Sequence, residues 1–493
     1  MGLLDRAGAC LTARPEDAEI LVVNTCSFID TAKQESVDTI LEMARYKTSG
    51  AAKKLIVAGC LVERYRDEIM KSIPEVDAVV GTGELESILE AAGLCRIELT
   101  GPAAATSLSP FTILTGKAAE TRPGQESQAG THKHEHHQET AFRPEGDLRE
   151  QQGRFRRDDW QGATHLLPTY LYDESTPRFL TTPKSSAYIK IAEGCDHPCT
   201  FCVIPNLRGK FRSRRFESVV AEAKQLVARG VEEITLIGQD TTCYGEDLGI
   251  REGLAQLLEA IASIEGVRWL RFLYAYPNRI TNSLLATIAK HDNICKYLDV
   301  PLQHASPQVL KTMKRGAGAD IFLKTIGKVR AAVPGVALRT SFIVGFPGET
   351  TQDIEILEDF VKAANFDWLG VFSYSDEEGS GAFSLDAKVP KRTIEARKRR
   401  LMKLQQSISK RAKQQWIGRE LVVLAEGESE ETPLLWEGRT EFHAPEIDGK
   451  VYINDFQELG PNVTTLEPGR FYKAKITEAL EYDVVARILS GPL

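Results

Sequence analysis

Long apolar runs and a regular cysteine framework are both missing from this chain of 493 residues. No apolar stretch approaches the roughly 20 residues of a membrane-spanning helix, which predicts no transmembrane segment. Residues 1–6 lack the apolar core of a secretory signal peptide. The nine cysteines are spread unevenly, and the pattern is unlike the disulfide scaffold of a secreted domain. We therefore expect a cytoplasmic protein. Four of the cysteines stand alone: Cys10, Cys95, Cys243 and Cys295.

A strong overall charge is also missing, since 61 Lys and Arg face 69 Asp and Glu. The acidity is concentrated in residues 416–493, which carry 15 acidic and 7 basic side chains. An acidic module is poorly suited to neutralising nucleic-acid phosphates, but it complements a basic protein. Hydrophobic residues make up 42% of the chain, an ordinary share for a soluble protein. The length exceeds one ordinary core and predicts three domains.

Residues 1–100 alternate strand and helix patterns, which predicts a parallel sheet with helices on both faces. Cys26 follows the first predicted strand and Cys60 the second. Carboxyl ends of parallel strands meet at one edge of a sheet, so the two thiols are candidate metal ligands. The alternative is that both are small buried hydrophobic residues. Cys10 precedes the first strand and is a poor third ligand. The predicted strands are 19–24, 54–58 and 76–80, and the helices are 28–46, 61–72 and one from about 84.

Residues 101–168 break this pattern and are rich in Ala, Thr, Gly, Gln and Pro. They predict a disordered or partly ordered insertion, so we take residues 101–180 as a linker between domains. Four histidines lie in it, at positions 132, 134, 136 and 137. They could bind metal adventitiously, but a solvated polar linker is favoured, because a catalytic site needs a rigid frame.

Strand and helix patterns return over residues 181–415 and predict a partial (βα)6 barrel. A highly charged helix over 392–415 leads to residues 416–493, where short strands separated by Gly and Pro turns predict a small β-barrel. The overall fold class is therefore α/β. The predicted strands of the central domain are 188–192, 233–237, 269–274, 297–301, 337–344 and 368–374, with helices such as 217–229 and 351–364 between them.

Three cysteines follow the first of these strands in a C-x3-C-x2-C spacing: Cys195, Cys199 and Cys202. The neighbouring Gly194 and Pro198 indicate a loop. Thiolates this crowded are usually held by a metal. Three cysteines on a four-iron cluster would leave one iron open for a substrate or cofactor. A zinc site completed by His197, a dithiol redox pair, or unrelated buried cysteines are the alternatives.

Glycine, proline and polar residues follow several other strands, at 238–240, 276–277, 303–305 and 345–349. Each segment alone is weak, because such residues usually just make turns, but all are expected on one rim of the barrel. Residues 207–215 add five cations beside the cysteine loop. They could form a solvated surface or attract an anionic substrate.

Taken together, these residues resemble the radical S-adenosylmethionine (SAM) enzymes, and within them the methylthiotransferase family. The three-cysteine loop carries the first likeness. Residues 187–195, Ile204-Pro205-x2-Arg208-Gly209, and the surroundings of Cys26 and Cys60 resemble the methylthiotransferases. Residues 301–306 and 443–449 are most similar to the branch that acts on a ribosomal protein. The likeness covers nearly the whole chain outside 101–168.

The resemblance implies two 4Fe-4S clusters and SAM as cofactors. Cys195, Cys199 and Cys202 would hold the catalytic cluster, whose open iron would chelate SAM. One electron from an external donor would cleave SAM to a 5′-deoxyadenosyl radical that abstracts hydrogen. The product would be an aspartate, in the twelfth protein of the small ribosomal subunit, methylthiolated at its β-carbon. Cys26 and Cys60 would belong to the second cluster, which supplies sulfur. Contacts to SAM are expected from Gln239, Gln303, Arg339 and Phe346.

The family's second cluster uses three cysteines, and the first lies on a strand before the helix that precedes Cys26. Residues 1–8 align with that helix, so we expect the N-terminal domain, 1–100, to lack its first strand and that cysteine. SAM cleavage should then survive while sulfur transfer is impaired. A tRNA-adenosine methylthiotransferase is the alternative function within the family, and a non-enzymatic zinc-binding adaptor is a more remote one.

Overall fold

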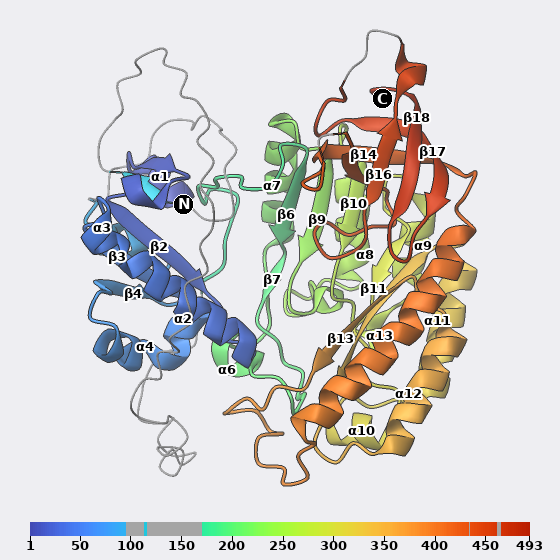
Figure 1. Cartoon of the computed structure of the whole chain (residues 1–493), viewed down its shortest axis with the longest axis horizontal. Helices are drawn as coiled ribbons and strands as arrows, with labels where there is room; N and C mark the ends of the chain where they lie inside the picture. The colour runs from blue at the N-terminus through green and yellow to red at the C-terminus, as the bar shows by residue number, and fades with distance from the viewer. Residues whose placement is uncertain (95–112, 116–169, 433, 461–464) are drawn as a thin grey trace.

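The computed structural model describes residues 1–94, 113–115, 170–432, 434–460 and 465–493 (Figure 1). It has three parts: an N-terminal sheet, a central barrel of parallel strands, and a small closed barrel at the C-terminus. This confirms the predicted α/β class. Within the described ranges, no helix has the length and apolar character needed to span a membrane.

The N-terminal sheet has five strands in the order β1-β5-β2-β3-β4. Alternate residues of its central strands face opposite sides. Leu21 and Leu55 pack on one side with helices α2 and α4, while Ile20 and Ile56 pack on the other with α1 and α5. Helices therefore cover both faces, as expected. The bounds are α1 Gly2–Arg6, β1 Cys10–Thr12, β2 Ile20–Thr25, α2 Asp30–Ala44, α3 Tyr46–Ser49, β3 Lys54–Gly59, α4 Cys60–Ser72, β4 Ala78–Val80, α5 Ser87–Ala92 and β5 Ile113–Thr115.

Two predictions for this region are corrected. The sheet is mixed, because β5 runs antiparallel to both β1 and β2, while β2, β3 and β4 are parallel. Strand β5 comes from the segment predicted as a linker, so the N-terminal sheet extends beyond residue 100. A three-residue strand is too short to show a period in the sequence. The remainder of 101–168, including the four histidines, and Cys95 lie outside the described residues.

The central barrel consists of two three-stranded parallel sheets, β10-β9-β6 and β11-β12-β13. The sheets meet where Leu270 bridges to Ile294 and Ala275 donates a backbone hydrogen bond to Asp299. Among the described strands, β6 and β13 do not pair, so one flank is open. The strands are β6 Ser186–Lys190, β9 Glu233–Ile237, β10 Trp269–Phe272, β11 Tyr297–Asp299, β12 Ala337–Val344 and β13 Trp368–Ser373. The helices are α6 Ile204–Arg208, α7 Phe216–Ala228, α8 Gly253–Ala262, α9 Asn282–Lys290, α10 Pro307–Thr312, α11 Ala319–Ala332, α12 Thr351–Ala364 and α13 Lys391–Gln414.

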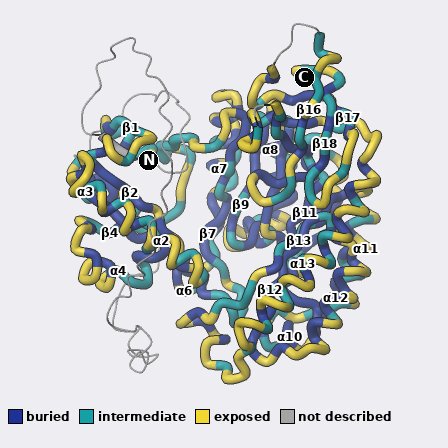
Figure 2. The backbone as a smooth tube through the Cα atoms, viewed as in Figure 1, coloured by how far each residue is buried: buried dark blue, intermediate teal, exposed yellow. Residues whose placement is uncertain are grey.

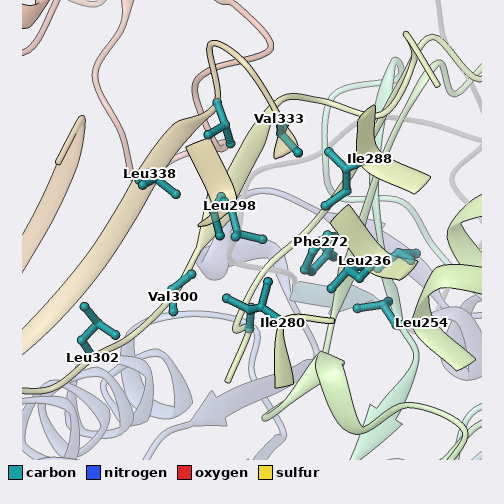
Figure 3. Packing of buried hydrophobic residues seen from close by; sticks show 14 of the residues in the cluster. Leu236, Leu254, Phe272, Ile280, Ile288, Leu298, Val300, Leu302, Val333 and Leu338 are labelled. Carbon is teal, nitrogen blue, oxygen red and sulfur yellow. The ribbon is translucent and has the colours of Figure 1, made fainter. Parts of the chain in front are cut away.

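One large hydrophobic cluster fixes these strands against the outer helices (Figure 3). Leu236, Phe272 and Leu298 come from three successive strands, and Leu254 and Ile288 come from the helices that cover them. Burial of such side chains contributes roughly 25 cal/mol per Å² of apolar surface. The cluster therefore sets the positions of the strand ends, from which the site is built.

The C-terminal strands close into a barrel in the order β14-β15-β16-β18-β17. This barrel contacts the amino ends of the central strands. Trp269 and Tyr297 belong to the same hydrophobic cluster as the barrel's Val423 and Phe471. The C-terminal barrel therefore covers the floor of the central barrel and does not cover the carboxyl ends of its strands, which form the mouth. Its strands are β14 Glu420–Glu428, β15 Trp436–Arg439, β16 Val451–Asp455, β17 Phe471–Ala479 and β18 Val484–Ser490.

Candidate functional site

The loop of the three cysteines begins just beyond β6, at the carboxyl ends of the barrel strands. A short pairing of β7 (Ala192–Glu193) with β8 (Arg212–Ser213) closes its base. Gly194 has φ +81°, and a Cβ there would lie 2.2 Å from the carbonyl oxygen of Lys210. Its backbone N–H donates to Oε1 of Gln239 at 2.8 Å, and Cys195 N–H donates to Gly209 O at 3.2 Å. Glycine is therefore required at the point where the loop leaves the strand.

The three thiols are free and half-buried. In the described part of the chain, the one set of three His, Cys, Asp or Glu donor atoms that all lie within 4.8 Å of each other is His197, Asp240 and Cys243. The cysteine sulfurs are thus not gathered around one ion. Tetrahedral zinc with Zn–S bonds near 2.3 Å would need sulfurs about 3.8 Å apart. In a four-iron cluster each thiolate binds a different iron, so the sulfurs lie farther apart.

Burial raises the pKa of the Cys195 thiol to about 11 and that of Cys202 to about 12. The negative charge of the neighbouring cysteines contributes to both raised values. Cys195 and Cys202 are therefore neutral at pH 7 unless a metal displaces their protons. Three soft, desolvated sulfur donors fit an iron–sulfur cluster by their chemistry.

His197 is an anchor of this loop and has its own partners. Its Nε2 lies 2.6 Å from Oδ2 of Asp240, and its ring stacks on Tyr276 with centroids 3.9 Å apart and planes 9° apart. Asp240 also accepts hydrogen bonds from Thr242 N–H at 2.9 Å and from Cys243 Sγ at 3.0 Å. These donors occupy the carboxylate, so the arrangement fixes the loop. Cys243, predicted to be solitary, takes part in it.

The far side of the loop is held by the segment after α10. Thr200 donates its N–H to Met313 O at 3.1 Å and its Oγ1 to Thr312 O at 2.9 Å. The Arg315 guanidinium lies 4.3 Å from the Tyr276 ring centroid and 3.8 Å from Cys199 Sγ. Arg315 thus brings a positive charge to the loop, 113 residues along the chain from Cys202, and no sequence motif indicated it.

Cys26 and Cys60 lie at the same edge of the N-terminal sheet, beyond β2 and β3. The two are neighbours: Ser27, which follows Cys26, donates from Oγ to Cys60 O at 2.9 Å. Cys26 is exposed and Cys60 is buried. Cys10 begins β1, which runs in the same direction as β2, so it lies toward the opposite edge, as expected.

Arg208 connects Cys60 with the cysteine loop. Its guanidinium donates to Cys60 Sγ at 3.1 Å and to Glu193 Oε1 at 3.2 Å. Burial raises the pKa of Cys60, and the positive charge of Arg208 opposes this. The other cations of residues 207–215 differ in exposure. Arg214 is buried, and its NH1 donates to Lys190 O at 3.0 Å, whereas Lys210 and Arg215 are exposed. The basic segment is therefore partly structural and partly a solvated surface.

The four predicted SAM contacts differ in exposure and in their position on the barrel. The Gln239 side chain accepts a hydrogen bond from Gly194 N–H at the base of the cysteine loop. Gln303 is partly exposed and has φ +72°, and its backbone N–H donates to Ser341 O of β12. Phe346 is fully buried against Val309 and Met313. As a SAM contact it stays a prediction.

Arg339, the fourth predicted contact, lies deeper in the barrel. It is the third residue of the eight-residue β12, below the rim. Its NH1 lies 2.8 Å from Asp299, and its Nε lies 3.5 Å from Asp448 of the C-terminal barrel. This pairing explains why the pKa of Arg339 is raised despite burial. Arg339 therefore connects the central barrel to the C-terminal barrel, and its guanidinium pairs with a carboxylate of each.

Comparison with known proteins agrees with this arrangement. Residues 189–361 match the Radical SAM superfamily, residues 1–81 an uncharacterized protein family, UPF0004, and residues 417–489 the TRAM domain. A protein from Koribacter versatilis, named ribosomal protein uS12 methylthiotransferase RimO, is 64% identical over 489 residues, which are 99% of this chain and 92% of the relative. The chain belongs to the RimO family. Similarly named proteins of Solibacter usitatus and Myxococcus xanthus are 51% and 40% identical, covering 99% and 100% of this chain and 91% and 88% of theirs.

Membership of the RimO family makes the chain a radical SAM enzyme that uses an iron–sulfur cluster and SAM, which excludes the zinc-adaptor alternative. Among solved structures, the radical SAM methyltransferase TsrM from Kitasatospora setae is 16% identical, with a TM-score of 0.44 over 72% of this chain and 62% of that chain.

Proposed function

We propose that this chain adds a methylthio group to the β-carbon of an aspartate in ribosomal protein uS12. The observation that carries the proposal is the 64% identity, over 99% of the chain, to a uS12 methylthiotransferase. The structure supports it through Arg208, which connects Cys60 of the N-terminal domain to Glu193 at the base of the cysteine loop. A β-carbon C–H bond is too weakly acidic for any side-chain base, so the reaction needs a cofactor.

Cys195, Cys199 and Cys202 are the proposed ligands of the catalytic 4Fe-4S cluster. When bound, this cluster together with SAM supplies the radical that breaks the C–H bond. The protein's own part is to hold the loop rigid through Gly194 and His197, and to keep the thiols desolvated. Binding the cluster must release the thiol protons, so cluster assembly should become easier as pH rises.

Cys26 and Cys60 are proposed as ligands of a second 4Fe-4S cluster that provides sulfur. Their support is proximity to each other and the contact of Cys60 with Arg208 at 3.1 Å. A cation hydrogen-bonded to a thiolate stabilises its charge. Gln239, Gln303, Arg339 and Phe346 remain the proposed SAM contacts. The electron would come from an external donor.

The protein substrate is expected to be attracted by charge. The TRAM barrel is acidic and projects Glu428 and Glu458 as exposed side chains. Ribosomal proteins are basic as a class because they bind RNA, so a negative surface would steer them toward the enzyme. The same charge opposes tRNA binding, which depends on cations that neutralise phosphates. A ribosomal substrate also agrees with the expected cytoplasmic location.

The test is mass spectrometry of purified uS12 after anaerobic incubation with the reconstituted enzyme, SAM and a reductant. We expect a fraction of the peptide that contains one aspartate to gain the mass of a methylthio group in place of hydrogen, because Cys26 and Cys60 provide only two ligands to the second cluster. Transfer RNA incubated in parallel should be unchanged. Modified tRNA with unmodified uS12 would replace this proposal by the alternative within the family.

A further inference from the structure

The segment that follows β13, residues 375–382, touches the catalytic cysteine loop. Ala382 N–H donates to Thr200 O at 2.7 Å, and Thr200 directly follows Cys199. One turn earlier, the Gly379 carbonyl accepts a hydrogen bond from Asn206 Nδ2 at 3.1 Å. In Figure 1 the chain runs from the end of β13 toward α6 here. This segment is therefore fastened to the loop on one side.

The same segment holds the N-terminal domain on its other side, through Glu377. Its side chain is 2% exposed, and its Oε2 lies 3.0 Å from Lys33 Nζ and 2.9 Å from Arg64 NH1. Its Oε1 accepts a hydrogen bond from Ser375 Oγ at 2.6 Å. Ser375 Oγ in turn accepts from the N–H of Asp30 at 3.2 Å, at the start of α2. One buried carboxylate thus pairs with two cations of another domain.

Arg64 extends this contact to both cysteines of the N-terminal domain. Its NH1 also donates to Ser27 O at 2.9 Å, and Ser27 lies next to Cys26. Arg64 belongs to α4, whose first residue is Cys60. Its NH2 donates to the Glu378 carbonyl at 3.1 Å. A single guanidinium therefore connects Glu377 to the two strand ends that carry Cys26 and Cys60.

We propose that Glu377 is a positioning residue that sets where Cys26 and Cys60 lie relative to Cys195, Cys199 and Cys202. The inference rests on the proposed function, because the relative position matters for sulfur transfer. Reacting groups must be held within a fraction of an ångström of productive geometry, and a displacement of about 1 Å can cost about a hundredfold in rate. A carboxylate buried between two cations fixes their positions, because removing it leaves the buried Arg64 without a carboxylate and Lys33 paired only with the exposed Asp30.

Hydrogen–deuterium exchange of the reconstituted holoenzyme tests this without using activity. The variants are Glu377→Ala, Glu377→Gln and a matched control, Glu378→Ala, whose side chain is exposed and whose carbonyl still serves Arg64. We expect Glu377→Ala to speed exchange about tenfold or more in the first turns of α2 and α4, since local opening governs exchange. Exchange in β9 and β10 should stay at the wild-type rate. The control should match wild type throughout.

The exchange of Glu377→Gln and the ratio of the two reaction products test the proposal further. If Glu377→Ala speeds exchange everywhere, Glu377→Gln, which keeps the shape and loses the charge, must still loosen α2 and α4 selectively. Wild-type exchange in both variants would overturn the proposal. In activity assays, the Glu377 variants should make more 5′-deoxyadenosine per methylthiolated product than Glu378→Ala does. A wild-type enzyme that gives no methylthiolated product would refute the proposed function, yet leave the exchange result standing on its own.

Discussion

The central barrel meets two other domains, and the two interfaces are built differently. At its floor it shares one hydrophobic cluster with the TRAM barrel, which includes Trp269, Trp368 and Trp416. At its mouth it meets the N-terminal domain through hydrogen bonds and ion pairs around Glu377 and Arg208. No hydrophobic cluster formed by the described residues spans that second interface. Figure 2 shows buried segments inside the N-terminal domain and, beside it, inside the barrel.

The floor interface also contains charges that are removed from water. Glu233 is fully buried and contacts Arg271 at 3.0 Å and Arg439 at 2.7 Å. Tyr297 donates to Asp448 at 2.7 Å, across the same boundary. Apolar burial and satisfied buried charges make two domains unfold together, whereas a polar interface permits relative motion. The difference indicates a rigid barrel and TRAM unit, to which the N-terminal domain is adjustably attached.

The largest expected effect concerns the chemistry at the mouth. Cys195→Ser should remove most of the iron of the catalytic site and reduce SAM cleavage to background, because a hydroxyl is a poor cluster ligand. Cys10→Ser, toward the opposite edge of the N-terminal sheet, should retain both. Iron analysis and chromatography of 5′-deoxyadenosine measure the two quantities. Normal SAM cleavage by Cys195→Ser would place the chemistry elsewhere.

Breaking the floor interface should cost the most stability. Glu233→Ala leaves the buried Arg271 without its carboxylate and Arg439 with Glu426 as its remaining carboxylate, which costs about 3–5 kcal/mol in the free energy of unfolding. Glu426→Ala removes a partly exposed partner of the same Arg439 and should cost about 1 kcal/mol or less. Denaturant unfolding followed by tryptophan fluorescence compares them. If TRAM unfolded in its own earlier transition in the wild type, the rigid unit would be refuted.

Acid should weaken the same interface. Burial alone would raise the pKa of Glu233, but Arg439 and Arg271 lower it to about 2 from the ordinary value of 4.5. Its contribution is therefore complete above pH 4.5 and is lost as the pH falls toward 2, amounting to about 3 kcal/mol. The stability difference between wild type and Glu233→Gln should shrink over that range in unfolding titrations. A constant difference would show that Glu233 does not titrate as proposed.

The smallest expected effect is at the mouth interface. Lys33 is 19% exposed beside Glu377, and Lys33→Ala should weaken attachment of the N-terminal domain by about 1 kcal/mol. Salt screens partly exposed pairs, so high salt should loosen the wild-type domain in the same direction. Limited proteolysis between residues 94 and 170 at low and high salt measures this. If neither Lys33→Ala nor high salt changed the rate of proteolysis, other contacts would have to hold the interface together.

Much of the frame was predictable because it follows from local patterns. The strands at 233–237 and 337–344 have the predicted bounds, since each is a buried run between turn residues. The cysteine loop was predictable because its three ligands lie within eight residues. The side chains that pack against Phe346 and pair with Arg339 were not predictable, because the position of a residue along a strand does not determine its contacts.

Contacts between distant segments could not be predicted. Glu377 lies more than 300 residues from Lys33 and Arg64, and nothing in its neighbourhood sets it apart from the adjacent Glu378. Strand β5 was missed because three residues show no period, and its pairing with β1 and β2 depends on the folded sheet. Such features depend on tertiary structure, which a single sequence does not display.

The edges of β6 and β13, which no other described strand of the barrel closes, have a consequence for access. With TRAM covering one end of the central barrel, a bulky polypeptide has to come in sideways or from the cysteine end. The acidic TRAM surface and the catalytic cysteines then belong to one rigid unit. A protein bound to TRAM would therefore lie at a fixed distance from the cysteines. The loop of the bound protein that is modified would then be one long enough to extend from its TRAM contact to the cysteines.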